Sequence, residues 1–225
     1  TDGLTIRSLS PAQDHKRSGE GDTGKNTGGM GAYSPVPLVT QELSWRIEQE
    51  ILQPTLEALK QQGIDYRGVL YAGLMITPAG EPKVIEFNCR FGDPETQVVL
   101  PLLDTPLDEI LLACVEQRLE QLPPLQWKSG SAVCVVAASG GYPDVYQKGK
   151  AIAGIPEAEQ QGAIVFQAGT KLEQAEIVTD GGRVLGITAV GDTFAEAVAI
   201  AYAALESIEF DAMYYRRDIG HRYRL

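Results

Sequence analysis

The stretch VIEFNCRFGDPETQ, residues 84–97, decides the predicted fold, because it begins as an apolar strand and ends in a polar turn. Side chains along a strand alternate between its two faces, so Glu86, Asn88 and Arg90 are predicted to share one face, with neighbouring pairs roughly 7 Å apart. An acid, an amide and a guanidinium in this arrangement favour a role of this strand face in ligand binding or catalysis. A solvent-facing strand with one polar face is the alternative interpretation.

The residues around this strand predict its partner and its burial. Ile85, Phe87 and Cys89 occupy the opposite face, which we expect to pack on the core. The run YRGVLYAGLMIT, residues 66–77, has strong β propensity and is followed by the turn signal PAGEP. The two segments are therefore predicted to pair as an antiparallel hairpin.

Helical patterns flank the predicted hairpin. Apolar residues recur at helical spacing over residues 41–63, with Thr40 as the expected N-cap, a kink or break at Pro54 and a stop at Gly63. Residues 95–119 predict a second helical region, which the sequence Asp-Thr-Pro interrupts.

The chain beyond residue 121 predicts a second unit. Residues 122–128 are polar and rich in proline, and we interpret them as a linker between a unit at 1–121 and a unit at 129–225. Short strands, with TDGGR as a hairpin turn, then predict a small antiparallel β domain with one helix. Strands are expected at 5–9 in the first unit and at 131–139, 163–166, 176–178 and 184–190 in the second, and the helix at 192–208, capped by Asp192 or Thr193.

Composition limits the functions that the chain can have. A net charge of −11 argues against a nucleic-acid partner, because phosphate-backbone binding needs a basic surface. No apolar run reaches the roughly 18 residues of a membrane span, and the first residues lack the order of a signal peptide, so no membrane partner is expected. The cysteines fit neither a zinc spacing nor a disulfide scaffold, and we expect buried free thiols in the cytoplasm; they are Cys89, Cys114 and Cys134.

A glycine-rich segment, GEGDTGKNTGGMG at residues 19–31, is predicted to be a long mobile loop. Met30 is its one aliphatic residue, a composition that does not favour core packing. Backbone N–H groups of such turns wrap phosphates, because no Cβ blocks the approach, and Asn26 and Thr27 add polar side chains. We expect the segment to cover a substrate; a plain flexible linker is the alternative.

Oxygen ligands on one strand face indicate a metal site. Mg²⁺ commonly binds one or two carboxylates together with substrate phosphates, and Glu86 and Asn88 supply a carboxylate and an amide oxygen. Arg90 is then placed to bind an anionic intermediate or a phosphate in bidentate fashion. Its alternative role is an ion pair with Asp93 or Glu95.

Several motifs together resemble a known family. They are QDHKR (13–17), DTGKNTGGMGAYSP (22–35), YAGLMIT (71–77), VIEFNCRFGDPETQ (84–97), AGTK (168–171) and GGRVL (181–185). With these motifs, in this order, the chain resembles over its whole length the phosphoribosylamine–glycine ligases, also called glycinamide ribonucleotide synthetases, of the ATP-grasp superfamily. The resemblance implies an α+β fold: the C-terminal part of an ATP-grasp domain, an antiparallel sheet with helices, followed by a small, mostly antiparallel β domain.

The resemblance also implies an activity and its partners. The family joins glycine to 5-phosphoribosylamine with ATP as co-substrate and Mg²⁺ or Mn²⁺ as cofactor, through a glycyl phosphate. Its enzymes are about twice this length, so we interpret the chain as a C-terminal half that needs the N-terminal half of the same enzyme and is inactive alone. The neighbouring strand, YAGLMIT, offers no acid, so a third protein ligand to the metal is not expected from it.

The family's motifs, carried onto this sequence, give the expected site. Two basic residues of the C-terminal unit are expected to meet one ribose phosphate, and the late stretch YYRRDIGHRYR is expected to pack on the missing half, with Arg216, Arg217 or Asp218 at the cleft edge. The predicted catalytic residues are Arg90, Asp14 and Lys16; the predicted substrate-binding residues are Arg17, Asn26, Thr27, Gly28, Gly29, Asp93, Lys171 and Arg183; and the predicted metal ligands are Glu86 and Asn88.

Two rival functions remain open at this point. One is an ATP-grasp carboxylate–amine ligase with a different acceptor, which the full run of family motifs disfavours. The other is a non-catalytic metabolite-binding or scaffold module, which has no use for a half-buried acid beside an amide and a guanidinium. Mg²⁺-dependent nucleotide binding that is lost on Glu86→Ala distinguishes a ligase from a scaffold module, because the scaffold module should show no such binding.

Overall fold

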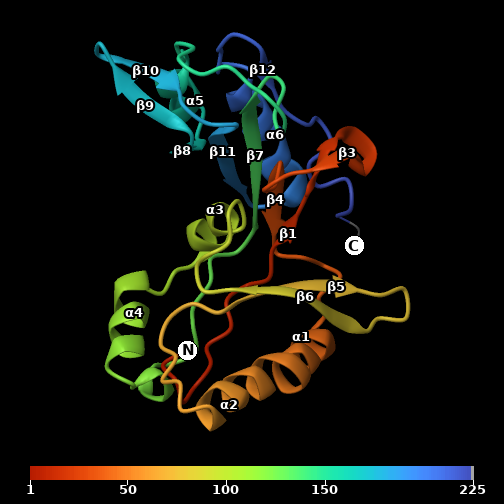
Figure 1. Ribbon diagram of the computed structural model, residues 1–225, viewed down its shortest axis with the longest axis vertical. Helices are drawn as coiled ribbons and strands as arrows, with labels where there is room; N and C mark the ends of the chain where they lie inside the picture. Colours follow the sequence, from red (N-terminus) through yellow and green to blue (C-terminus); the bar gives the residue numbers. More distant parts are fainter. Residues whose placement is uncertain (224–225) are drawn as a thin grey trace.

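A six-stranded antiparallel sheet and a separate hairpin organise the fold, which a computed structural model describes for residues 1–223 (Figure 1). The strand order of the sheet is β1-β4-β7-β11-β8, with β12 also paired to β7. The predicted mixture of helices and antiparallel sheets is confirmed. The strands of the sheet are β1 (Gln13–Asp14), β4 (Gly31–Ser34), β7 (Ser131–Ser139), β8 (Ile164–Gln167), β11 (Arg183–Gly191) and β12 (Met213–Tyr214).

The centre of the sheet forms the main core. Every residue of β7 is buried, which explains why its sequence is continuously apolar and lacks alternation. Helix α6 (Phe194–Leu205) packs on β7 and β11. As predicted, the Thr193 hydroxyl caps it by accepting from the Glu196 amide at 3.2 Å, and the Glu196 carboxylate accepts from the Asp192 amide at 2.9 Å.

Helix α5 (Ile155–Gln160) corrects the prediction of a single helix in this part of the chain. Its six residues are too few to show a helical repeat in the sequence, and its start depends on tertiary contact. Gly154 precedes it with a φ of +86°, and a Cβ there would lie 1.7 Å from the Ser207 carbonyl oxygen.

The hairpin of β5 (Tyr71–Ile76) and β6 (Pro82–Asn88) is antiparallel, as predicted. Figure 1 shows it above the helices that precede it in the chain. Gly73 pairs with Glu86, whereas the next residue of β5 pairs with Val84, so Ile85 is an extra residue in a β-bulge.

The predicted helix over 41–63 consists of α1 (Gln41–Ile47), the π-helical turn η2 (Glu48–Leu52) and α2 (Gln53–Gln61). The Thr40 hydroxyl accepts from the Leu43 amide at 3.2 Å, which confirms the cap, and Gly63 follows the helix with a φ of +75°. Pro54 is the second residue of α2, which directly follows the π turn. The irregularity therefore falls where Pro54 lacks an amide donor.

The second helical region is broken as predicted. Its segments are α3 (Thr96–Val99), η3 (Leu100–Leu102), α4 (Leu107–Val115) and η4 (Leu119–Gln121). The stretch 122–128 then runs back along η3, with the Lys128 amide donating to the Leu102 carbonyl at 2.8 Å. β1 and β4 belong to the first predicted unit and β7 to the second, yet all three strands lie in one sheet. The division into two units at 122–128 therefore stays a prediction.

The glycine-rich segment is more ordered than predicted. It begins at the last residue of β2 (Arg17–Gly19) and continues through η1 (Glu20–Asp22) and β3 (Thr23–Asn26), with β2 and β3 paired antiparallel. Met30 is fully buried in the main core. The prediction of a long loop without core contacts is therefore wrong, because backbone pairing and one buried methionine anchor a segment that has few apolar residues.

The late stretch anchors this hairpin. The Arg216 side chain is fully buried, with Nη1 3.1 Å from Asp22 Oδ1 and Nη2 2.7 Å from Asp218 Oδ2. It also donates to the Arg17 carbonyl at 3.0 Å. Partial burial opposes ionisation of Asp218, but the Arg216 hydrogen bonds lower its pKa to about 2. Arg216 thus binds its own chain, which corrects the expected place at a cleft edge; Arg224 lies outside the described residues.

Two further local predictions are wrong, and one strand was missed. TDGGR joins β10 (Glu176–Thr179) to β11, but β10 pairs with β9 (Thr170–Glu173), so TDGGR links two sheets and is no hairpin turn. The sequence of β9, TKLE, is too short and polar to predict a strand. Residues 5–9 form no strand, and side-chain bonds from Arg7 to the Leu119 and Leu122 carbonyls hold that segment.

The expected apolar face of β6 is exposed. Ile85 is 66% exposed and Phe87 41%, and Cys89 is also exposed, so the prediction that this face packs on a core is wrong for the chain as described. Cys114 and Cys134 are buried free thiols, as predicted. Within residues 1–223, no helix combines the length and the apolar character that a membrane crossing requires.

Candidate active site

Glu86 and Asn88 lie on one face of β6. They pair with Gly73 and Tyr71, and no bulge separates these two pairs, so the strand alternation holds between them. A Cβ on Gly73 would lie 3.0 Å from Glu86 Cγ, so a glycine on β5 leaves room for the acid. β6 ends at Asn88, and the strand therefore does not extend to Arg90, contrary to the prediction.

Arg90 follows the strand end with an exposed side chain. Its Nη1 donates to the Phe91 carbonyl at 2.9 Å. Asp93 and Glu95, the predicted alternative partners, form their described ion pairs with Arg183 and Lys16 instead. The Arg90 side chain is therefore held by a neighbouring carbonyl and not by a carboxylate.

The donor set on β6 fits a divalent metal ion. Carboxylate and amide oxygens are the ligand type that Mg²⁺ and Mn²⁺ prefer, and the glycine opposite Glu86 keeps the carboxylate accessible. No group of three or more histidine, cysteine, aspartate or glutamate side chains suited to a metal occurs in the described part of the chain. A metal ion bound by Glu86 and Asn88 would therefore need further oxygen ligands that do not come from such a side-chain group.

A second cluster joins the QDHKR segment to the residues that follow the Gly-Asp-Pro turn. Lys16 Nζ lies 2.5 Å from Asp14 Oδ2 and 3.9 Å from Glu95 Oε1. The Tyr71 hydroxyl donates to Glu95 Oε1 at 2.8 Å. β1, β5 and the residues after the turn thus bring two carboxylates, one amine and one phenol together.

Burial sets the protonation of this cluster. The Asp14 side chain is 8% exposed, and its burial, opposed by Lys16 and assisted by Glu95, raises its pKa to about 6. Burial lowers the pKa of Lys16, but the neighbouring Asp14 carboxylate and Glu95 reverse this and leave it raised. Burial and Glu95 raise the pKa of Tyr71. At neutral pH Asp14 is therefore ionised beside a charged Lys16.

Glycines let the two segments approach closely. Gly29 has a φ of +121°, and a Cβ there would lie 2.5 Å from Pro94 Cδ and 2.7 Å from Asp14 Oδ1. The Thr27 hydroxyl accepts from the Gly29 amide at 3.0 Å and donates to the Lys16 carbonyl at 2.9 Å. Thr27 and Gly29 therefore shape the turn that places Asp14 against the Gly-Asp-Pro segment.

Three predicted residues from distant segments meet at a junction. Arg183 Nη1 donates to the Gly28 carbonyl at 3.0 Å and to the Asp93 carbonyl at 2.9 Å, and its Nη2 lies 3.1 Å from Asp93 Oδ2. The Gly28 amide donates to the Tyr142 hydroxyl at 3.0 Å. The guanidinium, 22% exposed, thus ties β11 to the glycine-rich segment and the turn after β6.

Other predicted residues lie apart from this junction. Lys171 Nζ is 3.2 Å from Glu173 Oε2 on β9 and shares no described partner with Arg183. Arg17 Nη1 donates to the Gly24 carbonyl at 2.8 Å, and Asn26 pairs with Arg17 across the β2–β3 hairpin. Lys171 and Arg183 therefore have different carboxylate partners among the described residues, and their convergence on one anion stays a prediction.

Sequence reasoning missed three contributors to the site. Glu95 belongs to the quoted motif RFGDPETQ, and an acid two residues after Asp93 was a signal for a second buried carboxylate. Tyr71 stands opposite Asn88 across the hairpin, a position that the register fixes but the sequence alone does not. Tyr142 lies in a turn 114 residues from its partner Gly28, and no local signal predicts that contact.

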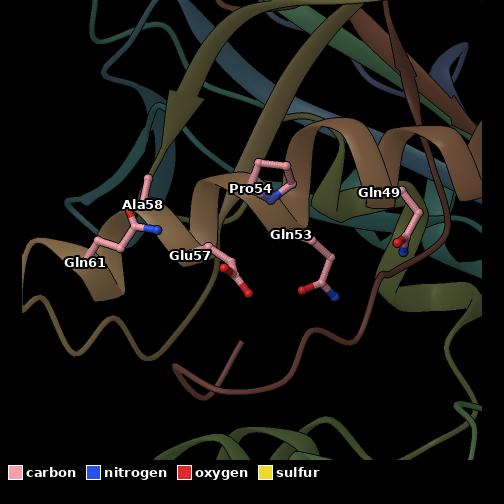
Figure 2. Close-up of a pocket in the computed structure, with 6 residues that line it drawn as sticks. All are labelled: Gln49, Gln53, Pro54, Glu57, Ala58 and Gln61. Carbon is pink, nitrogen blue, oxygen red and sulfur yellow. The ribbon is translucent and has the colours of Figure 1, made fainter.

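A surface hollow of about 370 Å³ lies elsewhere, beside η2 and α2. Figure 2 shows Gln49, Gln53 and Glu57 pointing to the same side of this helix. None of its lining residues belongs to the predicted site or to the carboxylate cluster; they are Gln49, Gln53, Pro54, Glu57, Ala58 and Gln61.

Comparison with protein families places the chain. The family described as "Phosphoribosylglycinamide synthetase, ATP-grasp (A) domain" matches residues 1–96, and "Phosphoribosylglycinamide synthetase, C domain" matches residues 132–222. The fold and the strand that carries Glu86 and Asn88 thus belong to the ATP-grasp class. Both matches describe one family, and the chain belongs to the phosphoribosylglycinamide synthetases.

Individual relatives agree with this placement. A phosphoribosylamine–glycine ligase of Nostoc sp. is 64% identical over 223 residues, which are 99% of this chain and 52% of that protein. The trifunctional purine biosynthetic protein adenosine-3 of Gallus gallus is 50% identical over 222 residues, or 99% of this chain and 22% of that protein. The chain thus spans about half the length of the single-function relative and less of the trifunctional one.

Solved structures show the same fold. The phosphoribosylamine–glycine ligase of Thermotoga maritima superposes with a TM-score of 0.86 at 37% identity, over 96% of this chain and 53% of that chain. The Kluyveromyces lactis urea carboxylase has a TM-score of 0.64 at 12% identity, over 99% of this chain and 18% of that one, a likeness of fold alone.

Proposed function

We propose that the protein that carries this chain ligates glycine to 5-phosphoribosylamine and converts ATP to ADP and phosphate. The observation that supports this proposal most is the metal-suited face of Glu86 and Asn88 on β6 in a phosphoribosylglycinamide synthetase fold. The chain spans about half of its relatives, so the N-terminal half of the same enzyme is proposed to supply the rest of the nucleotide site. The free thiols support a cytoplasmic location.

The reaction has two steps whose atoms balance. A carboxylate oxygen of glycine attacks the γ-phosphorus of ATP, the bond from that phosphorus to the bridging oxygen breaks, and ADP leaves. The amine nitrogen of phosphoribosylamine then attacks the carbonyl carbon of glycyl phosphate, inorganic phosphate leaves, and the nitrogen loses a proton. Such steps depend mainly on positioning and on charge stabilisation.

The residues of β6 are assigned to the charged groups of these steps. Glu86 and Asn88 hold Mg²⁺ or Mn²⁺, which neutralises phosphate charge when it is bound. Arg90, just beyond the strand, stabilises the acyl phosphate or the departing phosphate. Lys16 also contacts phosphate, beside the Asp14 carboxylate.

The remaining predicted residues are assigned to substrate binding. Thr27, Gly28 and Gly29 form the turn next to Asp14, and a Cβ on Gly29 would meet Pro94 of the Gly-Asp-Pro turn at 2.5 Å. The basic side chains outside the turn are proposed to bind the ribose phosphate. The substrate-binding set is Arg17, Asn26, Thr27, Gly28, Gly29, Asp93, Lys171 and Arg183.

Substrate-dependent ADP release by the full-length protein tests the proposal. With Mg²⁺ and ATP, and with no other amine nucleophile present, release must require both glycine and phosphoribosylamine, and Glu86→Ala must abolish it. Glu81→Ala is the matched control, because Glu81 is an exposed acid at the hairpin turn that pairs with Lys83 at 3.0 Å. ADP release that needs a different amine acceptor, or that survives Glu86→Ala, contradicts the assignment.

A further inference from the structure

The turn at residues 27–29 ends in two glycines, so its own side chains do little to fix its shape. Glycine has no Cβ and therefore more backbone freedom than any other residue. A Cβ on Gly29 would lie 2.5 Å from Pro94 Cδ, so close packing holds that residue in place. Gly28 is exposed, and its conformation must be fixed by bonds from elsewhere in the chain.

The amide of Gly28 differs from its neighbours in the origin of its hydrogen-bond partner. The amides of residues 27, 29 and 30 donate to acceptors within residues 15–27. The Gly28 amide instead donates at 3.0 Å to the Tyr142 hydroxyl, 114 residues away in the chain. Residues 27–30 thus depend on a distant tyrosine for one amide partner.

Residues of the second predicted unit hold Gly28 from both sides. Arg183 Nη1 donates to its carbonyl at 3.0 Å, and the Tyr142 hydroxyl accepts from its amide. Asp144, in the same turn as Tyr142, pairs with Lys25 at 2.7 Å. The Lys25 and Asp144 side chains are 66% and 61% exposed, so this ion pair contributes little. The position of the turn therefore depends mainly on Tyr142 and Arg183.

The Tyr142 ring is itself fixed next to Arg183. The Tyr142 amide donates to the carbonyl of Ser139, the last residue of β7, at 3.1 Å. The Ser139 amide donates to the Gly182 carbonyl at 2.8 Å, and a Cβ on Gly182 would lie 2.2 Å from Tyr142 Cδ2. A glycine directly before Arg183 thus leaves room for the ring. The Tyr142 hydroxyl is therefore held in place independently of the glycine-rich segment.

We propose that Tyr142 is a positioning residue, which through Gly28 keeps the turn at residues 27–29 ordered for phosphoribosylamine. This substrate is chosen because Arg183, which holds the other side of Gly28, is assigned to substrate binding with the basic residues of the ribose phosphate. The inference therefore rests on the proposed function. A turn that is ordered in advance loses less conformational freedom on binding, which increases affinity without a new contact to the substrate.

Steady-state kinetics of the full-length protein test the inference. Tyr142→Phe keeps the ring and removes the acceptor of the Gly28 amide. One lost hydrogen bond of this kind should raise the KM for phosphoribosylamine by about 3- to 10-fold. The KM values for glycine and ATP, and kcat, should change by less than about twofold, because a saturating substrate orders the turn in either protein.

Tyr146→Phe is the matched control for the loss of one phenolic hydroxyl. The Tyr146 ring centroid lies 6.3 Å from that of Tyr142, and the Tyr146 hydroxyl makes no hydrogen bond within residues 1–223. Tyr146→Phe should therefore leave all three KM values unchanged. A KM does not depend on the active fraction of a preparation, so partial misfolding of either variant does not produce the expected result.

Hydrogen exchange measures the positioning without any substrate. In the full-length protein, the Gly28 amide should exchange about 3- to 10-fold faster in Tyr142→Phe than in the wild type, because its hydrogen bond is lost. The Tyr146→Phe protein should exchange this amide at the wild-type rate. NMR spectroscopy of the labelled protein resolves the Gly28 amide from those of its neighbours.

Three results would overturn the role of Tyr142. They are an unchanged KM for phosphoribosylamine, an equal rise in all three KM values, and unchanged exchange of the Gly28 amide in Tyr142→Phe. A wild-type protein that does not ligate glycine to phosphoribosylamine would contradict the proposed function instead. Exchange of the Gly28 amide would then still decide whether Tyr142 holds the turn.

Discussion

The buried carboxylate of Asp14 makes the stability of the chain depend on pH in a direction opposite to that of most surface acids. Its pKa rises from 3.8 to about 6 on folding, mainly because of burial. A difference of about 2 in pKa corresponds to about 3 kcal/mol. The folded state binds the proton more tightly, so Asp14 destabilises the fold progressively as the pH rises from about 4 to about 6, and fully above that.

The variant Asp14→Asn removes this titration. Relative to wild type, it should gain about 3 kcal/mol in free energy of unfolding between pH 4 and pH 7, because only the wild type must bury an ionised carboxylate at the higher pH. Urea unfolding of both chains at several pH values measures this difference, and shared titrations cancel in it. Asp144→Asn is the matched control for the loss of one negative charge. A wild-type–variant difference that is constant with pH, or that falls as the pH rises, would refute the reasoning.

Three further predictions concern Gly29 in the glycine-rich segment, Arg216, which anchors the β2–β3 hairpin, and Lys171 on β9. Gly29→Ala should destabilise the chain by about 2 kcal/mol or more in urea unfolding, since its Cβ meets Pro94, whereas Gly21→Ala, at a φ of +62° with no atom within 4 Å, should cost less. Arg216→Met should cost about 3–5 kcal/mol in the same assay, because it removes the buried cation that pairs with Asp218 and Asp22, of which Asp22 keeps a second ion pair with Arg222; an effect below 1 kcal/mol would contradict this. Lys171→Ala in the full-length protein should raise the KM for phosphoribosylamine and leave that for glycine nearly unchanged, and equal changes in both would remove Lys171 from the phosphate site.

The periodic parts of the fold were predictable from the sequence. The alternation in VIEFNCRFGDPETQ and the β-rich run before it predict the hairpin of β5 and β6, and the register confirms that Glu86 and Asn88 share a face. The cap at Thr40 and the irregularity near Pro54 also follow from local chemistry. Each of these features depends on residues that are close in the sequence, which is why the sequence pattern is sufficient to predict it.

Features that depend on distant contacts were not predictable. The bulge at Ile85 interrupts the alternation before Glu86, and the end of β6 at Asn88 excludes Arg90 from the strand; neither is visible in the sequence pattern. Hairpin β2–β3 has almost no apolar residues, and Arg216, about 200 residues later, anchors it. Short polar strands such as β9 carry no periodic signal at all.

The candidate site, like the fold, was predictable only in part: its residues were predicted, but their contacts were not. The motifs predicted Asp14 and Lys16 as catalytic residues and Asp93 and Arg183 as substrate-binding residues, but did not predict which of them contact one another. The structure joins Asp14 to Lys16 and Asp93 to Arg183. Glu95 enters because chain folding brings it within 3.9 Å of Lys16, a proximity that spacing in sequence cannot give.

Trapping of the acyl phosphate tests the central claim most directly. The full-length protein is incubated with ATP, Mg²⁺, glycine and hydroxylamine in the absence of phosphoribosylamine, and glycine hydroxamate is measured. The account predicts that hydroxamate forms in an amount equal to the ADP released, and that Glu86→Ala abolishes both while Glu81→Ala does not. Ligation of glycine to phosphoribosylamine without any trapped hydroxamate, or hydroxamate formation by Glu86→Ala at the wild-type rate, would contradict it.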